Sequence, residues 1–256
     1  MGAGAGGRLR LGAGEGLMAA ETAQATAAEV VDLAVTPLRE LNRRLHELAG
    51  GSPQPRRWRV LNPNGAHAVG CGIDAEVEVE IEGHVGYYCA GMNKLATVRV
   101  HGNAGPGVAE NMMSGQVFVD GYASQSAGAT GRGGLLVVHG NASARCGISM
   151  KGIDIVVGGS VGHLSGFMAQ TGRLVVCGDA GDALGDSIYE TRIYVRGEVA
   201  GLGADCIEKE LRGEHLAELR ELLERAGIDG VDPNDFRRYG SERQLYNFKV
   251  DNASRY

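Results

Sequence analysis

Residues 155–178 read IVVGGSVGHLSGFMAQTGRLVVCG, and this stretch decides the fold. It contains two copies of one motif, in which Val157 and Val176 each stand two residues before a glycine, Gly159 and Gly178. The spacing from Gly159 to Gly178 continues in both directions along the chain without an insertion. The full series has seven glycines at this constant interval: Gly83, Gly102, Gly121, Gly140, Gly159, Gly178 and Gly197.

Four other positions repeat with the glycine. Two residues before it stand Ile81, Val100, Val119, Val138, Val157, Val176 and Val195. Four residues before it stand Val79, Val98, Val117, Leu136, Ile155, Leu174 and Ile193. Small or β-branched residues follow two positions after it, and only Ala or Gly follows seven positions after it. Apolar residues at alternate positions predict a short strand with one inward face. The glycine predicts a sharp turn after that strand, where φ is positive.

This pattern predicts an all-β fold, a right-handed parallel β-helix with seven coils over residues 75–204. One interval of the repeat corresponds to one coil, and each coil pairs with the next at about 4.8 Å, so equivalent positions stack into columns. The handedness follows by analogy from the rule for parallel crossover connections.

The composition agrees with tightly turning, ordered backbone. The chain has 256 residues and 42 glycines, where an average chain of this length has roughly 18. Only 6 prolines are present, which excludes collagen. The net charge of −6 argues against a nucleic-acid partner. No apolar run is long enough for a membrane span, and there is no secretory signal, so we expect a cytoplasmic protein.

The segments outside the solenoid are interpreted as follows. Residues 1–20 are a disordered Gly/Ala-rich leader, or they precede the true start at Met18. Residues 21–74 form a helical segment, with Thr36 and Pro37 as its cap, and a linker. Residues 205–256 form a helix over 206–226, bent at Gly213 and ended by Gly227, and an aromatic tail that docks on the solenoid or a partner. Glu76, Glu78, Glu80 and Glu82 would guard an edge strand at the first coil.

Few residues suggest chemistry. The five cysteines, Cys71, Cys89, Cys146, Cys177 and Cys206, form no CxxC motif, which predicts free thiols. Glycine-rich residues 128–134 precede a strand rather than a helix, which argues against a phosphate-binding loop. The column directly before the glycine contains His101, Asp120 and His139. These three form either a metal site or, as we favour, a surface ladder of hydrogen bonds. We therefore assign no catalytic, cofactor-binding or metal-binding residue.

A second column, three residues before the glycine, should point outward and is apolar over five coils. Its apolar members are Phe118, Val137, Val156, Val175 and Tyr194. Contiguous exposed apolar surface usually marks a contact site. Either the chain's own terminal helices or a partner subunit could pack on this column. We assign these five residues as the candidate interface.

Several stretches resemble a known family. IVVGGSVGHLSGFMAQTG and VVCGDAGDALGD resemble the GXGXG β-helix domain at the C-terminus of the glutamate synthase large subunit, and the likeness covers residues 75–204. GYYCAGMNKLATV, GVAENMMSG, ASQSAGATGRGGLLVV, ARCGISMKG and RYGSERQLYNF resemble the stand-alone GXGXG subunit of N-methylglutamate synthase, also called methylamine–glutamate N-methyltransferase.

The resemblance implies a non-catalytic structural subunit of a hetero-oligomer. Its expected partners are a glutamine-amidotransferase-type subunit and a glutamate-synthase-type subunit that carries FMN and an iron–sulfur cluster, with no cofactor in this chain. Three alternatives remain open: an ammonia-using glutamate synthase, a complex like formylmethanofuran dehydrogenase, and an independent enzyme with a metal on the His101/Asp120/His139 ladder.

Overall fold

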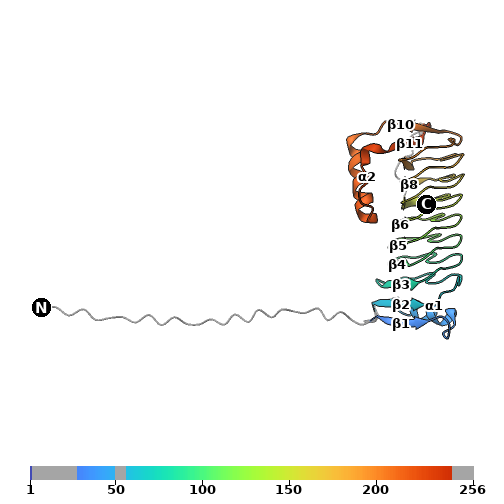
Figure 1. Cartoon of the computed structure of the whole chain (residues 1–256), viewed down its shortest axis with the longest axis vertical. Helices are drawn as coiled ribbons and strands as arrows, with labels where there is room; N and C mark the ends of the chain where they lie inside the picture. Colours follow the sequence, from blue (N-terminus) through green and yellow to red (C-terminus); the bar gives the residue numbers. More distant parts are fainter. Residues whose placement is uncertain (2–27, 50–55, 244–256) are drawn as a thin grey trace, which may run out of the picture.

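The computed structural model describes residue 1, residues 28–49 and residues 56–243, and these form a β-solenoid with two α-helices (Figure 1). The expected leader lies outside the described residues apart from Met1, as do Tyr246, Phe248 and Tyr256 of the aromatic tail. None of the helices in the described ranges is long and apolar enough to cross a membrane.

One sheet of 11 strands runs along the whole solenoid. Its strands in chain order are β1 (Glu29–Asp32), β2 (Arg57–Leu61), β3 (Glu78–Glu82), β4 (Thr97–Val100), β5 (Gln116–Val119), β6 (Leu135–Val138), β7 (Lys151–Val157), β8 (Thr171–Val176), β9 (Arg192–Val195), β10 (Cys206–Lys209) and β11 (Arg237–Ser241). The helices are α1 (Leu38–His46) and α2 (Gly213–Ala226), with a short 3-10 turn, η1 (Pro233–Asp235).

Strands β3 to β9 confirm the predicted register. Val98 pairs with Val117, one interval of the repeat further along the chain, and the same offset joins Leu136 to Ile155 and Leu174 to Ile193. A second line of parallel bridges, from Val85 to Val199, joins the coils on the other wall. The equivalent side chains of successive coils therefore stack as the repeat predicted.

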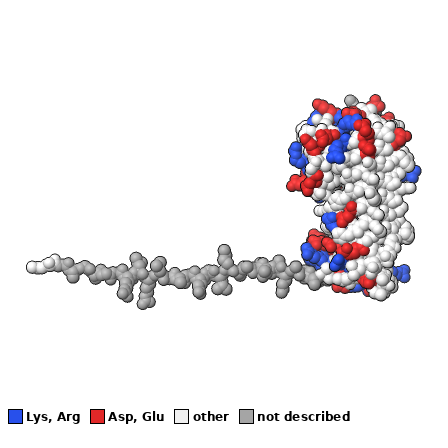
Figure 2. All heavy atoms as spheres, viewed as in Figure 1, with Lys and Arg blue, Asp and Glu red and all other residues white. Residues whose placement is uncertain are grey.

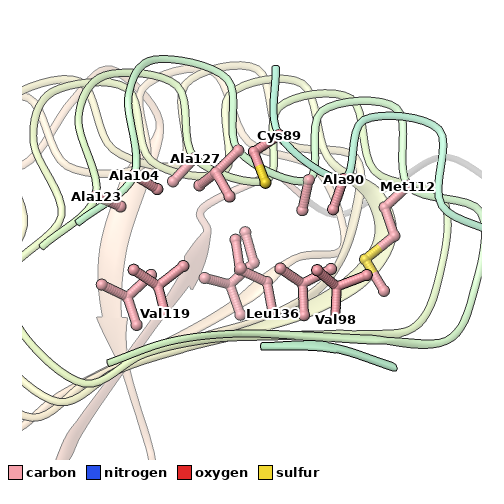
Figure 3. Close-up of a cluster of buried hydrophobic side chains, with 14 of the residues drawn as sticks. Cys89, Ala90, Val98, Ala104, Met112, Val119, Ala123, Ala127 and Leu136 are labelled. Carbon is pink, nitrogen blue, oxygen red and sulfur yellow. The ribbon is translucent and has the colours of Figure 1, made fainter. Parts of the chain in front are cut away.

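The core lies between these two walls. Figure 3 shows Val98, Val119 and Leu136 on the strand wall facing Cys89, Ala104 and Ala127 on the opposite wall. Five of these six residues are completely buried, and Ala104 is nearly so. The bulky aliphatic column thus packs against a column of small residues, which lets the two walls approach closely.

The glycine column is needed for a different reason from the one expected. Of the seven glycines, only Gly83 has a positive φ, of 130°. The others lie against the preceding coil: a Cβ on Gly159 would lie 2.0 Å from Asn141 Oδ1 and 3.0 Å from the backbone of Gly140. Positive φ occurs instead later in each coil, for example at Ala90 (52°).

The oxygen atom that lies where a Cβ of Gly159 would project is Oδ1 of Asn141, and it belongs to a ladder of hydrogen bonds that the sequence did not reveal. Asn141 Oδ1 accepts the backbone N–H of Ser160 at 2.9 Å, and Asp179 Oδ1 accepts that of Glu198 at 2.8 Å. Each acceptor directly follows a glycine of the repeat, as in Gly140-Asn141 and Gly178-Asp179. A short polar side chain after the repeated glycine was the signal that could have revealed this ladder.

The N-terminal boundary of the sheet differs from the expected one. The sheet begins well before residue 75, because β1 pairs with β2 and β2 pairs with β3, all in parallel. Strand β3 is therefore no edge strand, and its glutamates instead face arginines of β2. Helix α1 starts after Pro37 rather than being capped by Thr36, and buries Leu41 and Leu45 in the core.

The C-terminal end also corrects the expectation. Residues 206–209 form β10 and not a helix, since β10 pairs antiparallel with β11 and β11 pairs with β9. Gly213 begins α2 rather than bending it, and Gly227 ends it in a left-handed conformation, as expected. Phe236 and Tyr239 of the tail are buried, so this part of the tail docks on the solenoid.

Candidate functional site

The outer face of the sheet carries the residues that the sequence marked for function. One column of this face, which we call the outer column, joins equivalent residues of nine strands. Its members are Val30, Arg59, Glu80, Arg99, Phe118, Val137, Val156, Val175 and Tyr194. The column changes character at Phe118: the members before it are charged or exposed, and those from Phe118 onward are buried.

Helix α2 covers the apolar half of the outer column. Phe118, Val137, Val156, Val175 and Tyr194 form one buried cluster with Leu219, Leu222, Leu223 and Ala226 of α2 and with Phe236. Figure 1 shows α2 lying alongside the sheet at the C-terminal end of the solenoid. The assignment of these five residues as a partner interface is therefore wrong, because the chain's own helix removes them from solvent.

A row of polar contacts between α2 and strands β7 to β9, which we call the polar seam, holds the helix beside the cluster. The carboxylate of Glu218 accepts a hydrogen bond from the Tyr194 hydroxyl at 2.5 Å and lies 2.8 Å from Nη2 of Arg192. Asp154 accepts a hydrogen bond from Nε of Arg173 at 2.7 Å and lies 3.9 Å from Nη1 of Arg225. Burial, together with the neighbouring carboxylate, raises the pKa of Tyr194, so this phenol stays protonated as the donor. The seam fixes the register of α2 on the sheet.

The histidine ladder forms at the edge of the uncovered half. His101 Nδ1 lies 2.7 Å from Oδ2 of Asp120, which is a hydrogen bond, and His139 Nδ1 lies 3.7 Å from Oδ1. Desolvation alone would raise the pKa of Asp120, but the hydrogen bonds and positive charges of His101 and Arg99 outweigh it and the pKa is lowered. Asp120 is thus an ionised acceptor. The ladder of hydrogen bonds that we favoured is present for the His101–Asp120 pair.

The metal-donor atoms that converge lie on the Glu80 side of His101 and not on its Asp120 side. In the described part of the chain, the group whose donor atoms converge is Glu80, Glu82 and His101, not His101, Asp120 and His139. In the sequence these glutamates stand out only as charge on an expected edge strand. The missed signal is that Glu80 and Glu82 are two residues apart on one strand face, beside the histidine column.

The five thiols lack the environment of a catalytic nucleophile. Burial raises the pKa of Cys89 and Cys146 to about 12, and that of Cys177 and Cys206 to about 11. Burial also raises the pKa of Cys71. Reactive cysteines need the opposite shift, because the thiolate is the nucleophile. Cys89, Cys146, Cys177 and Cys206 are small core residues.

We expect a single thiol of the native chain to be accessible to reagents. Cys71 is half-buried, whereas the other four cysteines are buried. A thiol reagent such as DTNB at pH 7.5 should label at most one thiol of the folded protein and all five after denaturation. Cys71→Ser should abolish the native reaction. Labelling of Cys89 or Cys146 in the folded chain, located by peptide mapping, would contradict the burial described here.

Charged side chains are unevenly spread on the surface. On the face drawn in Figure 2 they gather near the two ends of the solenoid, and the stretch between carries few charges. Large apolar side chains are exposed on the coil turns; they include Tyr87, Met92, Leu95, Met113 and Tyr122. Tyrosine and methionine are enriched at protein interfaces, so these turns offer contact surface that α2 does not cover.

The coils define the class of this protein: a parallel β-helix built on a regular glycine repeat, one glycine to each coil. No family model matches the sequence. The chain is 65% identical over 227 residues to Protein GlxC of Rhizobium meliloti (strain 1021), which covers 89% of this chain and 99% of that relative. The chain therefore belongs to the same family as Protein GlxC.

Proposed function

We propose that this chain is the structural subunit of a glutamate-synthase-like complex and contributes no catalytic residue of its own. The observation that carries the proposal is the unbroken solenoid, whose coils resemble the GXGXG β-helix of glutamate synthase. In glutamate synthase, which these coils resemble, the β-helix holds the catalytic domains together. The match to Protein GlxC covers 89% of this chain, so the family relationship includes segments outside the solenoid as well.

The solenoid suits a scaffold physically. Its interior is filled by aliphatic and small side chains, so it offers rigid surface rather than an internal substrate cavity. Burial raises the pKa of the five cysteine thiols, which supports the proposal that the nucleophile for glutamine hydrolysis lies on another chain. The exposed tyrosines and methionines of the coil turns are suitable contacts for such a chain.

The finer proposal concerns the reaction. We propose N-methylglutamate synthase, which converts methylamine and L-glutamate to N-methyl-L-glutamate and ammonia. The partners would be an amidotransferase-type subunit and a subunit carrying FMN and an iron–sulfur cluster. The quoted stretches from Gly86 to Gly152 and from Arg238 to Phe248 support this choice over the generic solenoid, because they resemble the stand-alone subunit of that enzyme.

The test is recovery of the complex. The tagged full chain, expressed in its native host, should retain an amidotransferase-type chain and a flavin-containing chain in a fixed ratio, as measured by mass analysis and flavin absorbance. The recovered complex should form N-methylglutamate from methylamine and glutamate, and the purified chain alone should not.

Other outcomes distinguish the alternatives. Turnover only with ammonia and 2-oxoglutarate would indicate a glutamate synthase. Co-purification of molybdenum or tungsten subunits would indicate a formylmethanofuran-type complex. Recovery of the chain alone, or turnover by the chain alone, would contradict the structural-subunit proposal.

A further inference from the structure

Three donor side chains meet on the outer face of β3 and β4, on the half of the sheet that α2 leaves open. The donor atoms of Glu80, Glu82 and His101 all lie within 4.8 Å of one another, and His101 Nε2 is 3.8 Å from Oε2 of Glu80. A divalent ion bound at about 2.0–2.2 Å from each donor holds those donors about 3–4 Å apart. Small rotations of the exposed Glu80 and half-buried Glu82 carboxylates are enough to reach that spacing.

The sheet fixes the backbone under these donors. Glu80 and Glu82 project from the same face of β3 because side chains alternate along a strand. His101 follows β4 directly, and Ile81 pairs with Val100 just before it, which places His101 beside Glu82. Ile81 and Val100 are themselves completely buried in the core. The three donors therefore stand on a rigid platform rather than on a mobile loop.

The imidazole is already oriented as a ligand. Asp120, on the next coil, accepts a hydrogen bond from Nδ1 of His101 at 2.7 Å. The contact with Asp120 occupies Nδ1 and leaves Nε2, which lies 3.8 Å from Oε2 of Glu80, as the ring nitrogen available to a metal ion. A carboxylate behind a histidine is the usual support of a metal-bound imidazole, where it fixes the tautomer and the ring orientation.

The neighbouring arginines leave the donors accessible. Nε of Arg59 donates to Oε1 of Glu82 at 2.8 Å, which engages one of the two carboxylate oxygens. Arg99, the cross-strand neighbour of Glu80, extends the other way: its guanidinium lies 4.4 Å from the centre of the Phe118 ring and 3.3 Å from Asp120. The side of His101 that faces Glu80 thus carries two carboxylates, of which Glu82 has one oxygen engaged by Arg59.

We propose that Glu80, Glu82 and His101 bind one divalent first-row transition ion, such as Zn²⁺ or Co²⁺, with Asp120 as the residue that positions His101. The mixed imidazole and carboxylate donors favour such an ion over Ca²⁺ or Mg²⁺, which take oxygen ligands. Three protein ligands leave a fourth position open to water or to a side chain of another subunit.

Metal titration of the full chain tests this site. Chelator-treated protein at pH 7.5 is titrated with Co²⁺, followed by its visible absorption, and with Zn²⁺, followed by calorimetry. We expect one equivalent of each ion to bind. His101→Ala, Glu80→Gln and Glu82→Gln should each weaken binding at least about tenfold, and Asp120→Asn about 10–100-fold, as for other residues that support a metal ligand.

Two matched variants control for general charge and histidine effects. Glu78→Gln removes a glutamate of the same strand that faces Arg57 at 2.8 Å, and His163→Ala removes an exposed histidine of another coil. Both should bind the ions as the wild type does. Circular dichroism and thermal melting of each metal-free variant establish that it is folded. Absence of stoichiometric binding, or equal affinity in wild type and His101→Ala, would overturn the proposal.

Discussion

Valine in place of Gly159 is expected to destabilise the solenoid by several kcal/mol. A Cβ at this position would lie 2.0 Å from Oδ1 of Asn141 and 3.0 Å from the carbonyl carbon and oxygen of Gly140. The new side chain therefore expels Asn141, which leaves the backbone N–H of Ser160 without its acceptor. Overpacking costs about 1–3 kcal/mol and an orphaned N–H about 1–3 kcal/mol, out of a total stability of about 5–15 kcal/mol.

Denaturant unfolding of matched variants measures this effect. Gly213→Val is the control, because a Cβ on Gly213 meets nothing within 4 Å. It should change the free energy of unfolding by no more than about 0.5 kcal/mol. Should Gly159→Val not fold, Gly159→Ala and Asn141→Ala provide a double-mutant cycle. Removing Asn141 should reduce the cost of the new Cβ, and strictly additive costs would contradict the contact with Asn141 as the cause.

Aspartate in place of Val156 is expected to detach α2 from the sheet. Val156 is 0% exposed at the centre of the cluster formed with α2. Its new carboxyl group would also lie two residues from Asp154, which is already paired with Arg173. Burial of an uncompensated carboxyl group costs about 3–5 kcal/mol. The measurements are thermal melting and limited proteolysis, with cleavage in residues 210–236 as the sign of detachment.

The outer column itself supplies the control. Val30 belongs to the same column but is 57% exposed, because α2 does not reach β1. Val30→Asp should leave the melting temperature and the proteolysis pattern nearly unchanged. Equal damage from the two substitutions would mean that the cover of α2 is not what makes position 156 sensitive. A fully stable Val156→Asp protein would revive the interpretation of this column as an interface between subunits.

The repeat predicted the solenoid because every coil obeys one rule of spacing. Local periodicity did not reveal the ends, where the partners are distant in sequence. Strand β11 pairs with β9 although β10 and α2 lie between them in the chain, and β1 pairs with β2 across α1, so no short-range pattern marks them. Residues 206–226 read as one helix because Ile207 and Leu211 happen to continue the helical spacing of Leu219 and Leu222.

The candidate site was only half visible in the sequence. The column containing His101 and Asp120 followed from the register, and so did the closeness of the two side chains. The glutamates of β3 were assigned to an edge because β2 could not be foreseen as its neighbour. The outer apolar column was found from the repeat, and the chain's own terminal helices were one of the two covers considered for it. The repeat could not show which cover is present, because one helix can lie on many faces of a rod and the contacts of Glu218 that hold α2 here form only in the fold.

Helix α2 covers only part of the sheet, and this divides the solenoid into two parts that differ in stability. In a solenoid each coil touches only its neighbours, so loosening can begin at any coil and spread along the stack. The cluster under α2 runs from Phe118 to Tyr194, so the helix packs across β5 to β9 and joins them into one cooperative unit. Strands β1 to β4 lie outside the part of the sheet that α2 covers and are stabilised by the adjacent coils and by α1. Under load or on heating, we expect the coils of β1 to β4 to open before this unit does.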